Sequence, residues 1–319
     1  MSPGPKVVVT GGAGFIGANL TRQLIASGIA GSVTVVDDLS TGSRDNLAGV
    51  EGVHLVVGSI LEPTTLDGAM DGADAVVHLA ARPSVPRSMQ DPRRTHDVNA
   101  TGTIEVLEAV RRAGGPYAVV ASSSSVYGAS PELPKHEQLA PAPLSPYAAS
   151  KLATEAYTVA YAASFGLEVL PLRFFNVFGP LQPADHAYAA VIPAFVAAGL
   201  TGQALPVHGD GRQTRDFTYV GSVATAICEA ISRRVTSPMA VNLAFGSRRS
   251  LLEVVAVLGD VLGRELPVEH RAPRSGDVRH SQADRTRLLT LFPEFEPVPF
   301  RDGLEATVAW MREAMAVAV

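Results

Sequence analysis

The sequence predicts an α/β fold built on a doubly wound parallel sheet, with a smaller and discontinuous second region. Three observations support this prediction. Short apolar segments alternate with helical patterns through the first half of the chain, a glycine-rich turn follows the first segment, and an acidic residue ends the second. Such alternation is typical of a parallel sheet covered by helices on both faces.

Six segments have the apolar and β-branched composition of buried strands. They are Lys6 to Thr10, Val33 to Val36, His54 to Val57, Ala75 to Leu79, Ala118 to Ala121 and Glu168 to Leu172. Each is followed by a stretch of helical pattern or by loop residues. The order therefore indicates repeated βα units and a parallel sheet.

The turn after the first strand reads Gly11-Gly12-Ala13-Gly14-Phe15-Ile16-Gly17. Gly11 permits the tight turn, Gly14 lets the backbone approach a pyrophosphate, and Gly17 lets the next helix pack on the strand. The N-terminus of that helix then offers backbone donors to phosphates. Asp37 ends the second strand twenty residues after Gly17, where a carboxylate accepts from ribose hydroxyls and repels a 2′-phosphate. These residues predict a Rossmann-type site for NAD rather than NADP.

After about residue 173 the alternation gives way to loops rich in Pro and Gly. Helices are expected there over Ala189 to Ala198 and Leu251 to Leu262, and a strand over Met239 to Ala244 is expected to rejoin the sheet. We therefore expect an NAD-binding domain over residues 1–172 with about 217–245, and a substrate-binding domain over 173–216 and 246–319.

Tyr147 and Lys151 stand four residues apart in a helical pattern. At this spacing the two side chains share one helix face, so the ammonium can favour the ionised phenol. Such a tyrosine can take a proton from a sugar or alcohol hydroxyl while hydride leaves the same carbon. The alternative is an ordinary surface helix, but the glycine turn earlier in the chain favours a redox enzyme.

Composition excludes several partners. The net charge of −5 over 319 residues lacks the basic excess that nucleic-acid binding needs. No apolar run reaches the roughly 20 residues of a membrane span, and the N-terminus leads directly into a strand. We therefore expect no nucleic acid, no membrane and a cytoplasmic location.

Cysteine and histidine usage predicts neither disulfide nor metal. Cys228 is the single cysteine, and its apolar neighbours indicate a packing role. The eight histidines show no metal-ligand spacing, so we expect no metal site.

Nine short motifs follow one another along nearly the whole chain. They are Thr10 to Gly17, Asp37 to Gly42, His78 to Ala81, Asp97 to Thr103, Ser122 to Gly128, Ser145 to Lys151, Arg173 to Pro180, Arg215 to Val220 and Arg274 to Asp277. In this order they resemble the extended short-chain dehydrogenase/reductase family, and within it the NAD-dependent nucleotide-sugar epimerases and dehydratases.

The resemblance implies roles for individual residues. Ser123 would bond the substrate O4, Tyr147 would be the base, and Lys151 would hold the nicotinamide ribose and lower the tyrosine pKa. The implied cofactor residues are Gly11, Gly14, Phe15, Ile16, Gly17, Asp37, Asp38, Thr41, Gly42, Ser59, Ile60, Leu79, Ala80, Ala81, Asn99, Tyr147, Lys151 and Phe174. Ser59 is a departure, because many relatives place an aspartate there beside the adenine.

The resemblance also implies a binding site for a nucleotide-diphosphate sugar, with Asn176, Arg215 and Arg274 holding the diphosphate. The implied substrate residues are Ser84, Ser123, Ser124, Tyr147, Asn176, Val191, Arg215, Arg274, Asp277 and Ser281. A homodimer is implied through the helices at about Asn99 to Arg112 and Tyr147 to Ser164.

The residues after Ser123 distinguish reactions within the family. The 4,6-dehydratases place an acid pair there to eliminate water, and the decarboxylases place a glutamate. Here Ser124 and Ser125 occupy these positions, and hydroxyl pKa values are far too high for that chemistry. The sequence therefore favours a 4-epimerase that oxidises C4 to a 4-keto sugar and reduces it from the opposite face. A dehydratase or 4-ketoreductase, or a non-catalytic NAD-binding sensor, are the alternatives.

The sugar is less narrowly defined. The loop Ser84 to Ser88 resembles that of epimerases acting on N-acetylhexosamines, and Ser281 falls where a small side chain makes room for a 2-acetamido group. Ser281 can equally be a simple loop serine. A hexose, an N-acetylhexosamine or a uronic acid stays open, as does UDP or dTDP.

Overall fold

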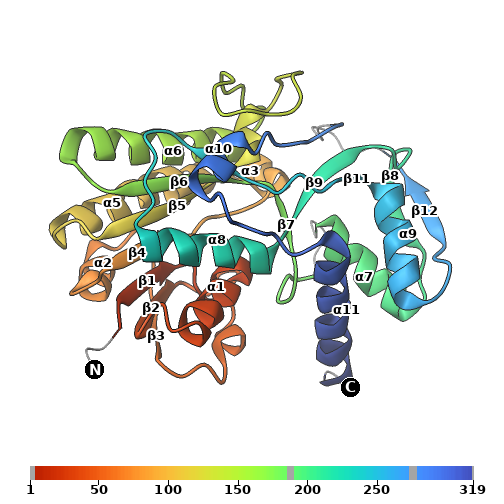
Figure 1. Ribbon diagram of the computed structural model, residues 1–319, viewed down its shortest axis with the longest axis horizontal. Helices are drawn as coiled ribbons and strands as arrows, with labels where there is room; N and C mark the ends of the chain where they lie inside the picture. Colours follow the sequence, from red (N-terminus) through yellow and green to blue (C-terminus); the bar gives the residue numbers. More distant parts are fainter. Residues whose placement is uncertain (1–3, 185–189, 273–278, 318–319) are drawn as a thin grey trace.

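The computed structural model describes residues 4–184, 190–272 and 279–317, and Figure 1 shows their arrangement. A sheet of seven parallel strands forms the centre, in the spatial order β10-β6-β5-β4-β1-β2-β3. Its strands are β1 (Lys6–Thr10), β2 (Ser32–Asp37), β3 (Val53–Val57), β4 (Ala75–His78), β5 (Tyr117–Ser123), β6 (Val169–Phe174) and β10 (Val241–Leu243). The predicted Rossmann-type α/β fold is confirmed.

Helices cover both faces of this sheet, because alternate side chains of a strand point to opposite faces. The main covering helices are α1 (Phe15–Ala26), α2 (Pro63–Met70), α5 (Gly102–Arg112), α6 (Pro146–Phe165) and α8 (Val220–Arg233). Val7 and Val9 of β1 belong to the core beneath α1 and α8, which contact each other. Val8, between them in sequence, belongs to the core beneath α2 and α5. Figure 1 shows α6 beside α5 along the same side of the sheet.

The strand order reverses between β1 and β4. At such a point the connections leave in opposite directions, which opens a crevice beyond the carboxyl ends of the strands. Gly11 follows β1 and Leu79 follows β4, so both lie at this crevice. The fold thus brings the glycine turn and the His78 to Ala81 motif together.

A second region lies beside the sheet, to the right in Figure 1. It contains the sheet β11-β9-β7 and the pair β12-β8. Its elements are β7 (Asn176–Phe178), α7 (Val191–Thr201), β8 (Leu205–His208), β9 (Thr214–Tyr219), β11 (Arg248–Ser250), α9 (Leu251–Leu262), β12 (Val268–Arg271) and α11 (Phe300–Val317). A separate aromatic core holds it together, with Phe178, Phe217 and Phe300 packed ring against ring.

The remaining short elements join these parts. They are η1 (Arg44–Leu47), α3 (Val85–Gln90), α4 (Pro92–His96), the π-helical turn η2 (Asp97–Thr101), η3 (Ser124–Tyr127) and α10 (Thr286–Leu291). Cys228 is buried in the core under α8, in line with a packing role. None of the described helices is both long and apolar enough to cross a membrane.

Most predicted elements form within two residues of their expected bounds. The strand expected over Met239 to Ala244 appears as β10 and pairs with β6, and α9 has the predicted bounds. Helix α7 begins at Val191, and Ala189 of the expected helix lies outside the described residues. The division into two domains stays a prediction.

Candidate active site

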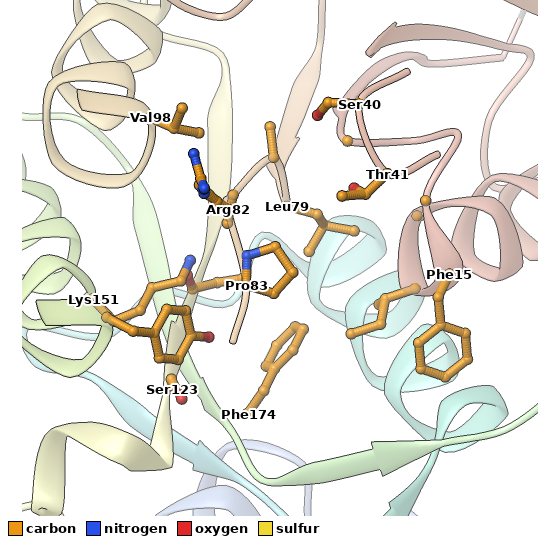
Figure 2. A pocket seen from close by; sticks show the side chains of 18 of the residues that line it. Phe15, Ser40, Thr41, Leu79, Arg82, Pro83, Val98, Ser123, Lys151 and Phe174 are labelled. Atoms are coloured by element: carbon orange, nitrogen blue, oxygen red, sulfur yellow. The ribbon is translucent and has the colours of Figure 1, made fainter. Parts of the chain in front are cut away.

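A cavity of about 860 Å³ opens at the carboxyl ends of the central strands, the usual ligand position in such sheets. Its described lining residues are Gly11, Gly14, Phe15, Ile16, Gly17, Val36, Asp37, Asp38, Ser40, Thr41, Gly58, Ser59, Ile60, Leu79, Ala80, Ala81, Arg82, Pro83, Arg87, Gln90, Arg94, Val98, Ala121, Ser122, Ser123, Ser124, Tyr147, Lys151, Phe174, Phe175, Asn176, Val177 and Gln182. Figure 2 shows Ser123 and Lys151 on one side of it, with Phe15 and Thr41 across from them.

The glycine turn is shaped by close backbone approaches. Gly11 has φ +72°, and a Cβ added there would lie 2.7 Å from the backbone nitrogen of Ala80. A Cβ on Gly17 would lie 2.2 Å from the carbonyl oxygen of Gly11, so only glycine lets α1 start this close to β1. A Cβ on Gly42 would lie 2.8 Å from the carbonyl oxygen of Ala13. Gly42 therefore packs against the turn and does not line the cavity, unlike the other predicted glycines.

The carboxylate of Asp37 faces this turn. Its Oδ2 accepts from the backbone N–H of Ala13 and its Oδ1 from that of Leu39, both at 2.9 Å. Burial raises the pKa of Asp37, and these two donors oppose that shift. Each oxygen keeps a further acceptor site, as a ribose diol requires. Ser59 also lines the cavity, and its hydroxyl accepts from the N–H of Leu61 at 3.2 Å.

Helix α6 presents two of the predicted catalytic residues. It begins with Pro146, and the hydroxyl of its N-cap, Ser145, accepts from the N–H of Ala148 at 3.1 Å. Both features are typical of a helix start. Tyr147 and Lys151 follow on one face of the first two turns and line the cavity.

Strand β5 supplies the third predicted residue and a partner for the second. Ser123 ends β5, and its Oγ accepts from the N–H and the hydroxyl of Ser125, at 3.2 and 2.9 Å. The Nζ of Lys151 donates to the carbonyl oxygen of Ala121, two residues earlier, at 2.8 Å. A hydrogen bond also links Tyr147 and Ser123. The structure thus brings Ser123, Tyr147 and Lys151 together.

Burial sets the titration behaviour of these groups. It lowers the pKa of Lys151 to about 8 and raises the pKa of Tyr147, while the hydrogen bond with Ser123 opposes the rise. The pKa of Tyr147 is therefore raised in the protein without cofactor or substrate, whereas the sequence predicts that Lys151 would lower it. The physical reason is that both groups lose water and the ammonium is directed to Ala121. Nearby, burial followed by the charge of Lys151 lowers the pKa of His78 to about 3, which keeps that ring neutral.

Asn99 differs from its predicted place, because it does not line the cavity. Its Oδ1 accepts from the backbone N–H of Arg82 at 2.7 Å, and its Nδ2 donates to the hydroxyl of Ser150 at 2.9 Å. The side chain is 1% exposed and lies in the π-helical turn η2. Asn99 therefore connects the segment after β4 with helix α6 through hydrogen bonds, and its own side chain lies outside the cavity lining.

The predicted substrate residues divide into three groups. Ser123, Ser124, Tyr147 and Asn176 line the cavity, and the Nδ2 of Asn176 donates to the carbonyl oxygen of Asp216 at 3.2 Å. Four lie outside its lining, namely Ser84, Val191, Arg215 and Ser281. Arg274 and Asp277 lie outside the described residues.

The backbone geometry and hydrogen bonds of two residues outside the lining, Ser84 and Ser281, show where they lie. Ser84 has φ +92°, an uncommon angle for a serine, and its hydroxyl accepts from the N–H of Arg87 at 3.4 Å to cap α3. The N–H of Ser281 donates to the carbonyl oxygen of Thr214 at 3.0 Å. The segment carrying Ser281 therefore runs beside β9, whose next residue is Arg215.

Sequence reasoning missed a basic wall of the cavity. Arg82, Arg87, Gln90 and Arg94 line it from the segment between β4 and η2, and Arg82 forms a 3.2 Å ion pair with Asp91. The concentration of arginines between two recognised motifs was the available signal. By contrast, the acidic residues among the described lining are Asp37 and Asp38, at the end of β2. No carboxylate of the described lining accompanies Ser123.

This combination defines an enzyme of the extended short-chain dehydrogenase/reductase class. The chain belongs to the NAD dependent epimerase/dehydratase family, whose model matches residues 7–244. Its cofactor is NAD, and the close glycine turn and the Asp37 carboxylate fit that group.

Relatives cover nearly the full length of the chain. A UDP-glucose 4-epimerase of Mycolicibacterium smegmatis is 34% identical, over 96% of this chain and 98% of the relative. The solved UDP-N-acetylglucosamine 4-epimerase of Methanobrevibacter ruminantium, in complex with UDP-N-acetylmuramic acid, has a TM-score of 0.92 and 35% identity, over 98% and 99%. A dTDP-glucose 4,6-dehydratase of Streptomyces venezuelae, solved with NAD, has a TM-score of 0.89 and 32% identity, over 98% of each chain.

Proposed function

We propose that the protein is an NAD-dependent 4-epimerase of UDP-hexoses or UDP-N-acetylhexosamines. The observation that carries the proposal is the meeting of Ser123, Tyr147 and Lys151 at a cavity whose described lining offers no carboxylate beside them. Elimination of water or loss of carbon dioxide needs an acid or base of suitable pKa near the sugar. Ser124, which follows Ser123 on the cavity wall, cannot serve as one.

The residues of the chain handle the proton of the substrate hydroxyl. When bound, NAD supplies a reversible hydride acceptor at C4 of the sugar. Tyr147 takes the O4 proton, and Ser123 bonds both O4 and the phenol during the transfer. Lys151 stabilises the phenolate with a positive charge in a site where burial strengthens electrostatic interactions. The same three groups return the proton after the 4-keto sugar has rotated in the cavity to present its opposite face.

Three residues hold the diphosphate in this proposal. Asn176 lines the cavity from β7, and Arg215 stands on β9, the neighbouring strand of the same small sheet. Arg274 completes the set, in a segment outside the described residues. Guanidinium groups suit phosphate oxygens because they donate two parallel hydrogen bonds. The sugar, free between this anchor and Tyr147, can then present either face.

Two observations bear on the choice between sugars. The relatives named for UDP-glucose and for UDP-N-acetylglucosamine are similar to this chain to nearly the same degree, at 34% and 35% identity. The small side chain of Ser281 favours the amino sugar, because a 2-acetamido group needs added room.

A substrate panel tests the proposal. The purified protein is incubated with UDP- and dTDP-sugars, and the products are resolved by proton NMR. A 4-epimerase gives an equilibrium mixture of C4 epimers without net change of NAD. A 4-keto-6-deoxy product, or one that has lost carbon dioxide, would replace the proposal with a dehydratase or decarboxylase.

We also propose a homodimer formed through α5 and α6. The face of α6 turned away from the sheet exposes Ala149, Ala156, Ala160 and Ala163, whereas Ala148 is buried. Tyr157 and Phe165 on this helix are 41% and 52% exposed. Small residues flanked by exposed aromatic rings permit close packing of a second helix pair.

A further inference from the structure

Glu155 extends the helix face that carries the proposed catalytic groups. Tyr147, Lys151 and Glu155 follow one another at intervals of four residues along α6. The Oγ of Ser122 donates to the Oε2 of Glu155 at 3.0 Å and to the backbone carbonyl of Lys151 at 3.4 Å. Three consecutive residues of β5 thus meet three consecutive turns of α6, because the neighbours of Ser122 bind Lys151 and Tyr147.

Arg173, on strand β6 next to β5, forms an ion pair with Glu155. Its Nε donates to the Oε2 of Glu155 at 2.9 Å and its Nη2 donates to the Oε1 at 2.5 Å, a two-pronged ion pair. Arg173 of β6 lies opposite Ser122 of β5, and the next pair in register is Phe174 with Ser123. Both members of that second pair line the cavity, while Glu155 and Arg173 do not.

Burial makes this ion pair costly unless its geometry is well satisfied. Arg173 is 3% exposed and Glu155 is 8% exposed. Replacing such a pair by apolar residues is often neutral or stabilising, whereas removing one partner leaves an uncompensated charge. The pair is therefore a weak contributor to stability, and its fixed two-pronged geometry points to control of register instead. The guanidinium is further held 4.7 Å from the ring centroid of Tyr127.

We propose that Glu155 and Arg173 are positioning residues for the reaction. Their ion pair locks α6 in one register on β5 and β6, so that Tyr147 and Lys151 meet Ser123. Their charges also compensate each other one helical turn from Lys151. The inference rests on the proposed function for its kinetic test only, because the charge compensation is observable without a substrate.

The titratable groups around the Glu155–Arg173 pair determine which pKa values an uncompensated charge would shift. His78 of β4 lies near Lys151, Tyr127 lies against Arg173, and Tyr147 and Lys151 share the helix with Glu155. His78 stays neutral because burial lowers its pKa to about 3. A charge left alone on Glu155 or Arg173 would therefore act on Lys151 and Tyr147.

Three variants test the proposal, namely Glu155→Gln, Arg173→Met and the double variant. We expect kcat to fall roughly 10- to 100-fold in each, with KM within about two-fold, because small misplacement of reacting groups costs rate. The double variant should regain thermal stability relative to the single variants without regaining kcat. Wild-type kcat in the double variant would overturn the positioning role.

Two controls separate this effect from general damage. The exposed ion pair of Glu168 and Arg234, each 50% exposed, receives the matched changes Glu168→Gln and Arg234→Met and should leave kcat unchanged. Leu170→Ala creates a cavity in β6, which carries Arg173, and lowers the melting temperature without touching the pair. If Leu170→Ala loses as much kcat as the Glu155 and Arg173 variants at the same loss of melting temperature, then Glu155 and Arg173 have only a structural role.

Titration of the phenol needs no substrate. The ultraviolet absorbance of Tyr147 is obtained as the difference between each NAD-loaded protein and its Tyr147→Phe counterpart. Arg173→Met should raise the apparent pKa of Tyr147, Glu155→Gln should lower it, and the double variant should restore it. Identical titrations in all four proteins would overturn the proposal, even if the wild type epimerises no sugar and the proposed function itself fails.

Discussion

The ammonium of Lys151 donates to the carbonyl oxygen of Ala121 at 2.8 Å, in surroundings that leave the lysine 4% exposed. Burial lowers the pKa of Lys151 from 10.5 to about 8. The folded protein therefore releases this proton before the unfolded chain does. Between pH 8 and 10.5 the unfolded chain binds more protons, so the contribution of Lys151 to the free energy of unfolding rises with pH. That contribution is full above this window and is lost as the pH falls through about 8.

Activity should follow the opposite course. We expect kcat to decline as the pH rises past about 8, because the neutral amine no longer stabilises the phenolate of Tyr147. Lys151→Arg keeps its charge at high pH and should move the decline to higher pH, although kcat at neutral pH falls because the guanidinium differs in shape. A pH series of initial rates measures this. A decline at the same pH in both proteins would assign it to another group.

Tyr147→Phe should abolish most turnover without weakening substrate binding. The phenyl ring keeps the packing of the first turn of α6 and loses only the group that accepts the O4 proton. Loss of a general base typically costs about 10² to 10⁴ in rate. Kinetics of wild type and variant, with the bound NAD of each quantified, measure the effect. A variant that keeps near-normal kcat would show that another residue is the base.

The parts of the site that were predictable from sequence depend on local geometry. The glycine turn needs positive φ and close backbone approach within one βα unit, so its residues are fixed by spacing, as at Gly11 and Gly17. Asp37 is predictable for the same reason. It ends β2, which pairs with β1, so it lies beside the glycine turn that follows β1. The strand expected at residues 239–244 was also found, through its apolar composition.

Other parts depend on contacts that spacing does not encode. Asn99 was expected in the cofactor channel, yet its amide is occupied by Arg82 and Ser150, which come from two other segments. Arg94 of α4 lines the cavity, and the arginine content of its segment alone does not place it there. The pairing of Glu155 with Arg173 likewise arises only when α6 packs across β5 and β6.

The protein should purify with NAD(H) bound, because a redox-neutral cycle requires a retained cofactor. Denaturation followed by chromatography detects the released dinucleotide. Asp37→Asn removes the negative charge but keeps an acceptor for the N–H of Ala13, so we expect relative affinity for NADP over NAD to rise by about 10-fold or more. Dissociation constants are compared after removal of the bound cofactor. An absence of dinucleotide in the wild type, with a strict need for added NADPH, would contradict the role of Asp37.

The proposed dimer should dissociate when charge is placed on the exposed face of α6. Ala156→Glu combined with Ala160→Glu adds like charges at the centre of the expected helix contact, where they would be desolvated. Light scattering at micromolar concentration should give a dimer for the wild type and a monomer for the variant. The matched control Ala113→Glu, at the exposed end of α5, should stay dimeric. A monomeric wild type would exclude this interface.

The last prediction concerns Ser281 and the choice of sugar. Its N–H donates to Thr214 through the backbone, so a change of side chain leaves this contact in place. If the serine leaves room for the 2-acetamido group, Ser281→Tyr should selectively abolish turnover of UDP-N-acetylglucosamine and spare UDP-glucose, because added bulk in a close-packed site excludes the larger sugar. The ratio of kcat/KM for the two sugars cancels any general loss of folding, and Ser281→Ala should keep the wild-type ratio. Equal losses on both sugars would remove the amino-sugar assignment and leave a 4-epimerase whose specificity is set elsewhere.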